Sequence, residues 1–434
     1  MELLYQYLWK YRLFGSRLKL VDGRNIDIIH PGRLNTDAGP DFSDARLLVE
    51  GVRWAGNVEI HERASDWYRH GHDRDRAYDS VVLHVVGQAD REVTVSDGVR
   101  LLPTVQVTVP AGFFMTYREL SEDRREVRCQ SRLKELTELE VLDWTETLGI
   151  ERLQTKGARI ESYLRESNGD WDQAVFITLA RALGFGLNAL PFEMLAKSLP
   201  LNFLGRHADN PFQVEALMFG QAGLLDSTRH PFDRYYQSLC REYAFLRAKY
   251  SLKPLEGSVW KCARTRPGNF PWRRIALLAR GFMDARSLLG AILIHADKPK
   301  YLTNLFSWEY EGYWETHSSF GSEQNLRKSS GLTRKSVSLL LINMVAPLLY
   351  VYGMLHSDER LTNAALRLLD DLPAEDNAII ASWRSAGIEC GCAMRSQALL
   401  HLRRQYCDAG RCLDCRFGYH LLKRNFQKQV TANS

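Results

Sequence analysis

The chain has 434 residues, of which 45% are hydrophobic and 25% are charged, and its formal net charge is +5. This length accommodates two or three domains, and this composition is that of a globular protein with a sizeable core, which excludes a disordered or fibrous chain. Inspection of the sequence finds no uninterrupted apolar stretch of the roughly 20 residues that a membrane span needs, and no targeting segment at the start. We therefore expect a cytoplasmic protein with no membrane partner.

The N-terminal part alternates between helix and strand patterns. Its first 15 residues carry leucine and tyrosine at helical spacing and predict an amphipathic helix. Asp22-Gly23 and Asp97-Gly98 lie between β-like runs, and Asp-Gly tolerates the positive φ angles of tight hairpin turns. In chain order, the patterns predict strands at 18–21, 25–30, 45–50 and 52–61, a helix at 65–80, a strand at 80–87 and a hairpin at 91–110.

From about Glu119 the spacing of the apolar residues changes from two to three and four. The long stretches that follow, such as 138–164 and 336–355, are typical of helices. The sequence therefore predicts an α+β protein. A mixed sheet with flanking helices occupies residues 1–125, and a large, mostly α-helical region occupies 126–434.

Two acids and a histidine stand out on the third and fourth predicted strands. Asp41 precedes one strand, and Glu59 and His61 lie two residues apart on the next, so their side chains leave the same face. If these strands pair through the turn near Gly51, Asp41 and Glu59 meet at the same end of the hairpin. Carboxylate oxygens are the ligands that Mg²⁺ and Mn²⁺ prefer, and a bound ion would activate a water and stabilise charge on an attacked phosphate.

These residues resemble the core of the PD-(D/E)xK phosphodiesterase superfamily of nucleases. GPDF is followed eighteen residues later by Glu-x-His, on a helix–strand–strand–strand–helix–strand order. The resemblance implies that Asp41 and Glu59 bind the catalytic metal ion, and that His61 stands where the superfamily usually has a lysine that orients the water. Glu2 on the first helix matches an additional acid of some members.

The activity that this resemblance implies is metal-dependent cleavage of phosphodiester bonds in nucleic acid, by a hydrolase. The alternative is a catalytically inactive, nuclease-like scaffold that binds nucleic acid or a protein. The nuclease-like part covers roughly residues 1–90, about a fifth of the chain.

A second resemblance covers nearly the whole chain. The stretches GRLNTDAGPDF, WAGNVEIH, SDWYRHGHDRDRAYDSVVLHVV and RPGNFPWRRIALLA, with the cysteine-rich end, resemble an uncharacterised bacterial family, domain of unknown function 2851. That likeness implies no established activity.

Histidines are dense in the N-terminal part. Five of the twelve fall within 55 residues: His30, His61, His70, His72 and His84. Zinc binding is therefore an alternative to the carboxylate site. Its ligands would be His61, Asp66, His70 and His72. His70 and His72 cannot share one helix face, so we expect a helix end or a loop there. In the alternative without a site, Asp41 caps a turn and Glu59 pairs with a nearby arginine.

The eight cysteines are unevenly placed. Cys129, Cys240 and Cys262 are scattered and look like ordinary buried or half-buried thiols. The other five lie within 26 residues: Cys390, Cys392, Cys407, Cys412 and Cys415. In a chain without a secretion signal, such a cluster favours a metal site over disulfides.

The last three cysteines, Cys407, Cys412 and Cys415, have the close spacing of metal ligands. Either Cys390 or Cys392 can supply the fourth thiolate that a tetrahedral zinc ion or a [4Fe–4S] cluster needs. We expect a structural metal site at about 390–418, with zinc and the cluster both open. The alternative is a set of unligated thiols.

Basic residues gather in two places. From Gly391 to the C-terminus there are eight Arg or Lys against two acids, and RPGNFPWRR at 266–274 mixes arginine with aromatic rings. Both can contact a nucleic-acid backbone. The alternatives are a solvated helix face and a connection whose Trp272 and Arg274 anchor a helix. The sequence carries no P-loop, no G-x-G-x-x-G and no G-x-S-x-G, so nucleotide hydrolysis, dinucleotide binding and α/β-hydrolase chemistry have no support.

Overall fold

The structure, a computed structural model, describes residues 1–14, 18–263, 265, 267–284, 288–323 and 331–432. The chain divides into two compact units. The sheet unit consists of Met1–Trp144 with Arg403–Ser434, and the helical unit is Thr145–Leu402. The predicted division into residues 1–125 and 126–434 stays a prediction, and in this division by contacts the C-terminal segment belongs with the sheet. The α+β class is confirmed by the mixed sheet and the largely helical region that follows it.

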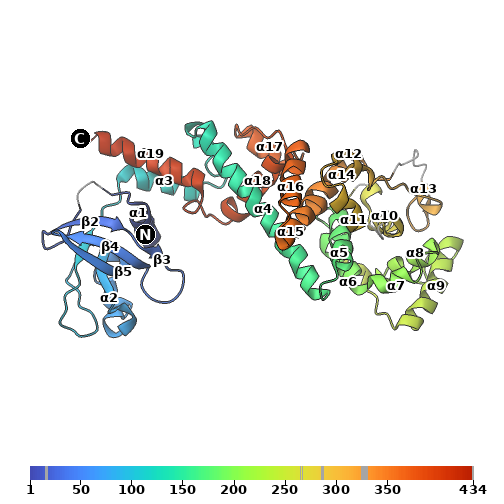
Figure 1. The fold of residues 1–434 in the computed structure, drawn as a ribbon, viewed down its shortest axis with the longest axis horizontal. Helices are drawn as coiled ribbons and strands as arrows, with labels where there is room; N and C mark the ends of the chain where they lie inside the picture. Colours follow the sequence, from blue (N-terminus) through green and yellow to red (C-terminus); the bar gives the residue numbers. More distant parts are fainter. Residues whose placement is uncertain (15–17, 264, 266, 285–287, 324–330, 433–434) are drawn as a thin grey trace. The chain divides into compact units, whose positions relative to one another are not determined.

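A seven-stranded mixed sheet forms the centre of the sheet unit (Figure 1). Its strands are β1 (Leu18–Lys19), β2 (Asn25–His30), β3 (Arg33–Leu34), β4 (Phe42–Val49), β5 (Val52–Arg63), β6 (Val81–Gln88) and β7 (Thr104–Gln106). The order is β1-β2-β4-β5-β6-β7, with β3 beside β4. The pairs from β1 to β5 are antiparallel, whereas β5–β6 and β6–β7 are parallel.

The two edges of this sheet approach each other. Leu20 and Val105 form a β-bridge, and Val21 N–H donates to the Thr104 carbonyl at 2.8 Å. The sheet is therefore nearly closed, and backbone groups at both edges have hydrogen-bond partners.

Helices and single helical turns complete the sheet unit. They are α1 (Glu2–Tyr11), α2 (Asp66–Arg69), α3 (Ala111–Glu122), the 3₁₀ turns η1 (His72–Arg74), η2 (Arg76–Tyr78) and η3 (Gln130–Glu135), the first part of α4 (Glu138–Glu166), the π-helical turn η8 (Arg403–Cys407) and α19 (Arg416–Ala432). The predicted N-terminal helix is confirmed as α1, which buries Leu4, Tyr7, Leu8 and Trp9. α1 and α2 both pack against β5.

The single helix predicted at 65–80 is broken in the structure. α2 is one turn long and is followed by Gly71 in the left-handed region (φ 78°), which a continuing helix does not accommodate. Asp75 is extended, and its side chain accepts from Ala77 N–H at the start of η2. The segment between β5 and β6 is therefore a short helix followed by two tight turns.

The C-terminal helix α19 packs on α3. The rings of Tyr419 and Tyr11 lie 4.8 Å apart, and His420 Nδ1 is 2.9 Å from Glu140 Oε1 in α4. Arg424 pairs with the same glutamate. Both ends of the chain thus belong to one unit.

The helical unit contains the remaining elements. They are the rest of α4, α5 (Trp171–Leu183), α6 (Ala189–Ser198), α7 (Leu201–Gly205), α8 (Pro211–Gln221), α9 (Arg234–Tyr250), η4 (Gly257–Val259), η5 (Pro267–Asn269), α10 (Pro271–Asp284), α11 (Leu288–Ile294), α12 (Pro299–Asn304), α13 (Tyr313–Thr316), the hairpin β8 (His317–Ser319) and β9 (Ser322–Glu323), α14 (Arg334–Leu340), the π-helical turn η7 (Leu341–Val345), α15 (Ala346–His356), α16 (Glu359–Asp371), α17 (Ala378–Ser385) and α18 (Ala393–Leu402).

One continuous helical segment, Arg334–His356, runs through α14, η7 and α15. It is long and apolar enough to cross a membrane by length and composition, with a mean hydropathy of 1.8 over its most apolar window. Asn343 and Pro347 interrupt the apolar run of this segment, so it is not one uninterrupted apolar stretch in the sequence. Within the unit 67% of that window is buried, as in the core helix of a globular domain. The buried Lys156 of α4 donates to Asn343 Oδ1 at 2.8 Å.

Gly220 in α8 allows the close packing of α8 on α9, because a Cβ there would overlap the ring of Tyr243. Replacing Gly220 by Ala is expected to lower the free energy of unfolding by roughly 1–3 kcal/mol through overpacking. Gly290→Ala in α11 is the matched control. Its added methyl meets open space, so it should leave stability unchanged or raise it by up to about 1 kcal/mol. Thermal unfolding followed by circular dichroism compares the two variants, and equal effects would contradict the packing argument.

Candidate metal centre

Two carboxylates meet where β4 begins and β5 approaches its end. Phe42 pairs with Val58 across the antiparallel strands, which places Asp41 beside Glu59. The backbone N–H of Asp41 donates to Glu59 Oε2 at 2.9 Å. This is the arrangement that the hairpin reasoning predicts.

Helix α1 closes one side of this carboxylate pair. Gln6 Nε2 donates to Asp41 Oδ1 at 2.8 Å, and Ile60 N–H donates to Asp41 Oδ2 at 3.0 Å. Glu2 lies one helical turn before Gln6 and is near enough to His70 and Glu59 for their charges to affect its pKa. The first helix therefore contributes an acid and an amide to the site.

Three imidazoles lie beside the carboxylates. His61, His70 and His72 each offer a ring nitrogen, and these nitrogens all lie within 4.8 Å of one another. His61 Nε2 is 3.1 Å from His70 Nδ1. The left-handed Gly71 turns the chain between His70 and His72, so both rings reach the same point although they cannot share one helix face.

Glu59 joins the two halves of the site. Its Oε1 lies 3.3 Å from His72 Nε2 and 3.6 Å from His61 Nε2, while its Oε2 accepts from Asp41. Glu59 is 5% exposed and His61 is 1% exposed, whereas His70 is exposed. The cluster is thus buried beneath β5 and opens to solvent at His70.

Other side chains hold the imidazole rings in place. His61 Nδ1 is 2.8 Å from Nε2 of His84, a fully buried residue of the parallel neighbour β6. His72 stacks on Tyr78 with ring centroids 3.8 Å apart, and the buried ring of Trp67 lies 5.3 Å from that of His72. A hydrogen bond to the second ring nitrogen is what usually orients a metal-binding histidine.

Burial dominates the electrostatics of the site. Burial and then the Glu59 carboxylate raise the pKa of Asp41 to about 7, and burial raises the pKa of Glu2. Burial and then the neighbouring ring of His84 lower the pKa of His61 to about 2, so its imidazole is neutral. A neutral imidazole keeps a lone pair for a metal, and mutually repelling carboxylates are stabilised by a cation.

The structure gathers three of the four residues of the predicted zinc site. Asp66 instead accepts from Arg63 N–H at 3.1 Å and pairs with Arg69 at 3.0 Å. His30 is exposed, and its Nδ1 accepts from Gly32 N–H.

The sequence analysis missed two contributors to this site, Gln6 and Tyr78. The four-residue spacing of Glu2 and Gln6 on one face of α1 was the signal that could have found the first of them.

A family model with the description "Protein of unknown function (DUF2851)" matches residues 2–378. The chain belongs to the DUF2851 family. The matched range contains the whole candidate metal centre and ends before the C-terminal cysteines. No curated protein and no solved structure matches the chain.

The cysteine cluster of the DUF2851 chain is divided between the units. Cys390 and Cys392 belong to the helical unit, where the Cys392 thiol lies 3.9 Å from Asp370 Oδ1. Cys407, Cys412 and Cys415 belong to the sheet unit. That Cys390 or Cys392 completes a site with these three stays a prediction.

Several arginines of the two basic stretches of the DUF2851 chain are buried or form ion pairs with acids of the same chain. Arg273 and Arg274 are 1% and 4% exposed, so the burial favours the alternative in which RPGNFPWRR anchors a helix. Arg273 donates to the carbonyls of Trp314 and His317 at 2.9 Å. Several tail arginines form ion pairs within the sheet unit. These pairs are Arg403–Asp408, Arg411–Asp414, Arg416–Asp143 and Arg424–Glu140.

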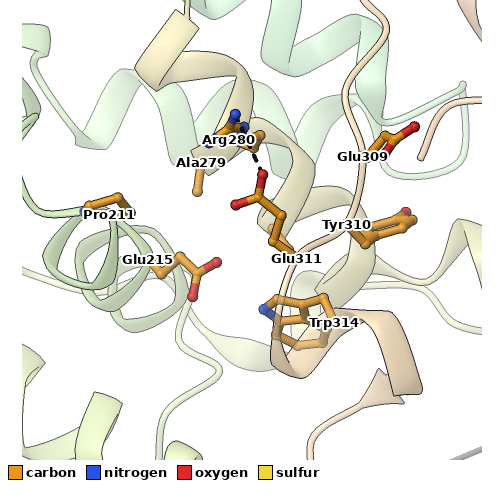
Figure 2. Close-up of a pocket in the computed structure, with 9 residues that line it drawn as sticks. Pro211, Glu215, Ala279, Arg280, Glu309, Tyr310, Glu311 and Trp314 are labelled. Carbon is orange, nitrogen blue, oxygen red and sulfur yellow. Dashed lines mark ion pairs between the residues drawn. The ribbon is translucent and has the colours of Figure 1, made fainter. Parts of the chain in front are cut away.

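The helical unit also contains a small cavity, of about 60 Å³, between α8, α10 and α13. Figure 2 shows Glu215 and Trp314 lining it, with the Arg280–Glu311 ion pair beside them. Sites for small molecules usually enclose roughly 300–1,000 Å³, so this cavity suits water rather than a substrate. Burial raises the pKa of Glu215 to about 7, although the Tyr235 hydroxyl donates to it.

Metal binding at the histidine cluster is testable by isothermal titration with Mn²⁺ and Zn²⁺. Because three imidazoles converge, His72→Ala is expected to weaken binding by more than about 10-fold. His30→Ala removes an exposed histidine of the same sheet and serves as the control, with affinity unchanged. Equal affinity in wild type and His72→Ala would show that the ion binds elsewhere.

Glu215 should make stability depend on pH. Its folded pKa of about 7 lies above the ordinary value of 4.5, so the folded protein binds the proton more tightly, and stability falls as the pH rises between these values. Glu215→Gln removes this loss while keeping an acceptor for Tyr235. We expect the difference in unfolding temperature between Glu215→Gln and wild type to be several degrees larger at about pH 8 than at about pH 5.

Glu309→Gln is the control for that measurement, because it removes an exposed acid beside the same cavity. The pH-dependent difference should be missing in this variant. A Glu215→Gln protein whose unfolding temperature follows that of the wild type at every pH would refute the assignment.

Proposed function

We propose that this chain is a metal-dependent phosphodiesterase that cleaves nucleic acid at the cluster around Glu59. The observation that carries the proposal is the meeting of three imidazoles, whose ring nitrogens lie within 4.8 Å of one another, with the Glu59 carboxylate, which lies 3.3 Å from His72 and 3.6 Å from His61. Clusters of histidine and acid in a partly open site are typical of hydrolytic metal centres.

The ligands proposed for the metal ion are His61, His70, His72 and Glu59. Nitrogen ligands suit Mn²⁺ and Zn²⁺ better than Mg²⁺, which prefers an all-oxygen shell. Of the two ions expected from the acids, Mg²⁺ and Mn²⁺, we therefore propose Mn²⁺. Zn²⁺ is the other ion that suits three imidazoles. Such an ion lowers the pKa of a bound water and stabilises charge on the attacked phosphate.

The protein residues have separate roles in this proposal. The Asp41 backbone N–H fixes the orientation of the Glu59 carboxylate. The Asp41 side chain accepts a hydrogen bond from Gln6, which holds it in place. His84 orients the ring of His61 from beneath. Since His61 is neutral, it does not supply the positive charge that a lysine gives at this position, and the proposal makes it a ligand instead.

The substrate class follows from the surroundings of the exposed His70. Arg69 and Arg74 lie on the same segment, and their side chains are 71% and 88% exposed. Exposed arginines beside a metal suit a chain of phosphates, because each can bind a phosphate through two hydrogen bonds. If the two-residue strands β1 and β3 are left out, the order α1, β2, β4, β5, α2, β6 is the one on which the resemblance to the PD-(D/E)xK superfamily rests, and that resemblance favours a nuclease over another hydrolase.

The test is cleavage of single-stranded and duplex DNA and RNA oligonucleotides with Mn²⁺, Zn²⁺ or Mg²⁺. Glu59→Gln is expected to lower the cleavage rate by at least about 100-fold, since it removes the anionic ligand that joins both halves of the site. The control is Glu62→Gln, an exposed acid three residues along the same strand. It should cleave at the wild-type rate.

Cleavage that survives in Glu59→Gln would place the activity outside this site. If the wild type binds the metal at His72 but cleaves none of these substrates, the catalytically inactive scaffold replaces the phosphodiesterase.

A further inference from the structure

A second cavity of the helical unit, of about 320 Å³, is lined by the end of α5, the start of α6, the start of α10 and the segments that precede α6 and α10. Its volume lies within the usual range of small-molecule sites, whereas that of the cavity beside Glu215 does not. The floor is buried and the rim is exposed. The buried lining residues include Leu183, Asn188, Phe192 and Arg274, and the exposed ones include Leu187 and Asn269.

Arg274 brings a positive charge into the wall of this cavity. The residue is 4% exposed, and a guanidinium keeps its proton even when it is buried. Its Nη2 donates to Asn269 Oδ1, and its Cζ lies 4.5 Å from the centroid of the Phe185 ring. Because Asn269 and Phe185 also line the cavity, the guanidinium lies at its wall. Its Nε and Nη1 are buried and have no hydrogen-bond partner in the part of the chain that the structure describes.

The described lining of the cavity offers Arg274 no negative charge, because none of these residues is an acid. Burial lowers the pKa of Arg274, and of its neighbours Tyr310 raises this pKa and Arg273 lowers it. Arg273 itself donates to two backbone carbonyls at 2.9 Å and lies 3.7 Å from the centroid of the Tyr310 ring. A buried charge is costly unless an opposite charge or hydrogen bonds compensate it. Arg274 is therefore a buried cation that an anion in the cavity would stabilise.

The loop between α5 and α6 is held in one shape. A Cβ on Gly184 would lie 2.5 Å from the Asn188 carbonyl oxygen, and Phe185 has a φ of 43°. The left-handed region is unfavourable for a bulky residue, and such strain is typical of ligand sites whose surroundings maintain it. Here Asn188 Nδ2 donates to the Lys261 carbonyl at 2.8 Å, and Asn188 Oδ1 accepts from Lys261 N–H at 2.9 Å. These two hydrogen bonds join the loop to the segment before α10, so the cavity is formed before a ligand binds.

We propose that this cavity binds a small organic acid, whose carboxylate pairs with Arg274. One guanidinium balances one negative charge, so a carboxylate fits better than a doubly charged phosphate, which would leave a buried negative charge. Leu183 and Phe192 are 0% and 1% exposed and supply apolar surface for the hydrocarbon part of the acid. The site belongs to the helical unit, and the proposal does not rest on the metal centre.

The test is isothermal titration of the full-length protein with benzoate, hexanoate, benzamide and inorganic phosphate. Benzoate, hexanoate or both are expected to bind the wild type at one site per chain. Benzamide has the shape of benzoate without its charge, so it should bind at least about 10-fold more weakly than benzoate. Phosphate lacks the apolar part and should bind more weakly than the tighter of the two acids.

Arg274→Met replaces the guanidinium by an apolar side chain of similar length. It should weaken the binding of benzoate by at least about 10-fold and leave the affinity for benzamide unchanged. Since the substitution removes a buried charge, the variant should unfold at the same temperature as the wild type or higher. Arg280→Met is the matched control, because Arg280 lies on the same helix and pairs with Glu311 at 3.5 Å. Its affinity for benzoate should equal that of the wild type.

The wild type alone keeps the proposal falsifiable if Arg274→Met is poorly folded. A wild type that binds neither acid, or that binds benzamide as tightly as benzoate, would overturn the role of Arg274 as an anion site. Tighter binding of phosphate than of either acid would overturn the carboxylate. Equal affinity for benzoate in the wild type and a folded Arg274→Met protein would place the binding elsewhere and would also overturn the proposal.

Discussion

The antiparallel register of β4 against β5 is the constraint on which the candidate metal centre depends. It sets Asp41 opposite the end of β5 that carries Glu59, and a slip by one residue would turn Glu59 and His61 to the other face of the sheet. A register shift between Phe42 and Ala45, with Asp44 in the left-handed region, adjusts the strand at the point where the acids meet. The parallel pairing of β5 with β6 then brings His84 beneath His61.

The same strand serves both the core and the site. From Val58 to His61 every residue of β5 is buried, and the alternation of side chains sends the apolar Val58 and Ile60 to one face and Glu59 and His61 to the other. A buried face that carries acid and imidazole needs hydrogen-bond partners for each polar atom. Here partners come from α1, β6 and the short turns after α2, whereas His84 Nδ1 has none among the described residues.

Much of this arrangement could be predicted from the sequence, and the reason is that it is local. Apolar and polar residues alternate along β4 and β5, which predicts the hairpin. The meeting of Asp41 and Glu59 then follows from strand geometry alone. The convergence of His70 and His72 was harder to predict, because it depends on the left-handed Gly71 and on the early end of α2. The residue patterns that favour a helix and those that favour a pair of 3₁₀ turns are too similar for the sequence to distinguish the two structures.

The cysteines show the limit of such reasoning. Spacing along the chain groups Cys407, Cys412 and Cys415, and the structure places them between the end of η8 and the start of α19. The spacing gives no reason to associate this turn with the end of α3, where the Cys412 thiol lies 3.7 Å from the Leu120 carbonyl oxygen, because that contact arises from the packing of α19 on α3. Cys390 and Cys392 are close to these three cysteines in sequence but belong to the helical unit, and that either of them completes a site with the three stays a prediction. Contacts of this kind depend on tertiary structure that no local pattern encodes.

The return of α19 to the sheet unit has a consequence for synthesis on the ribosome. The roughly 260 residues of the helical unit are made between the two parts of the sheet unit, and at about 5–20 residues per second this takes roughly 15–50 s. During that time α3 lacks the helix that covers it, and the buried side chains Phe417, Leu421 and Leu422 of α19 have not yet been made. The packing of the sheet unit is therefore completed only after the helical unit has been synthesised, when α19 becomes available to cover α3.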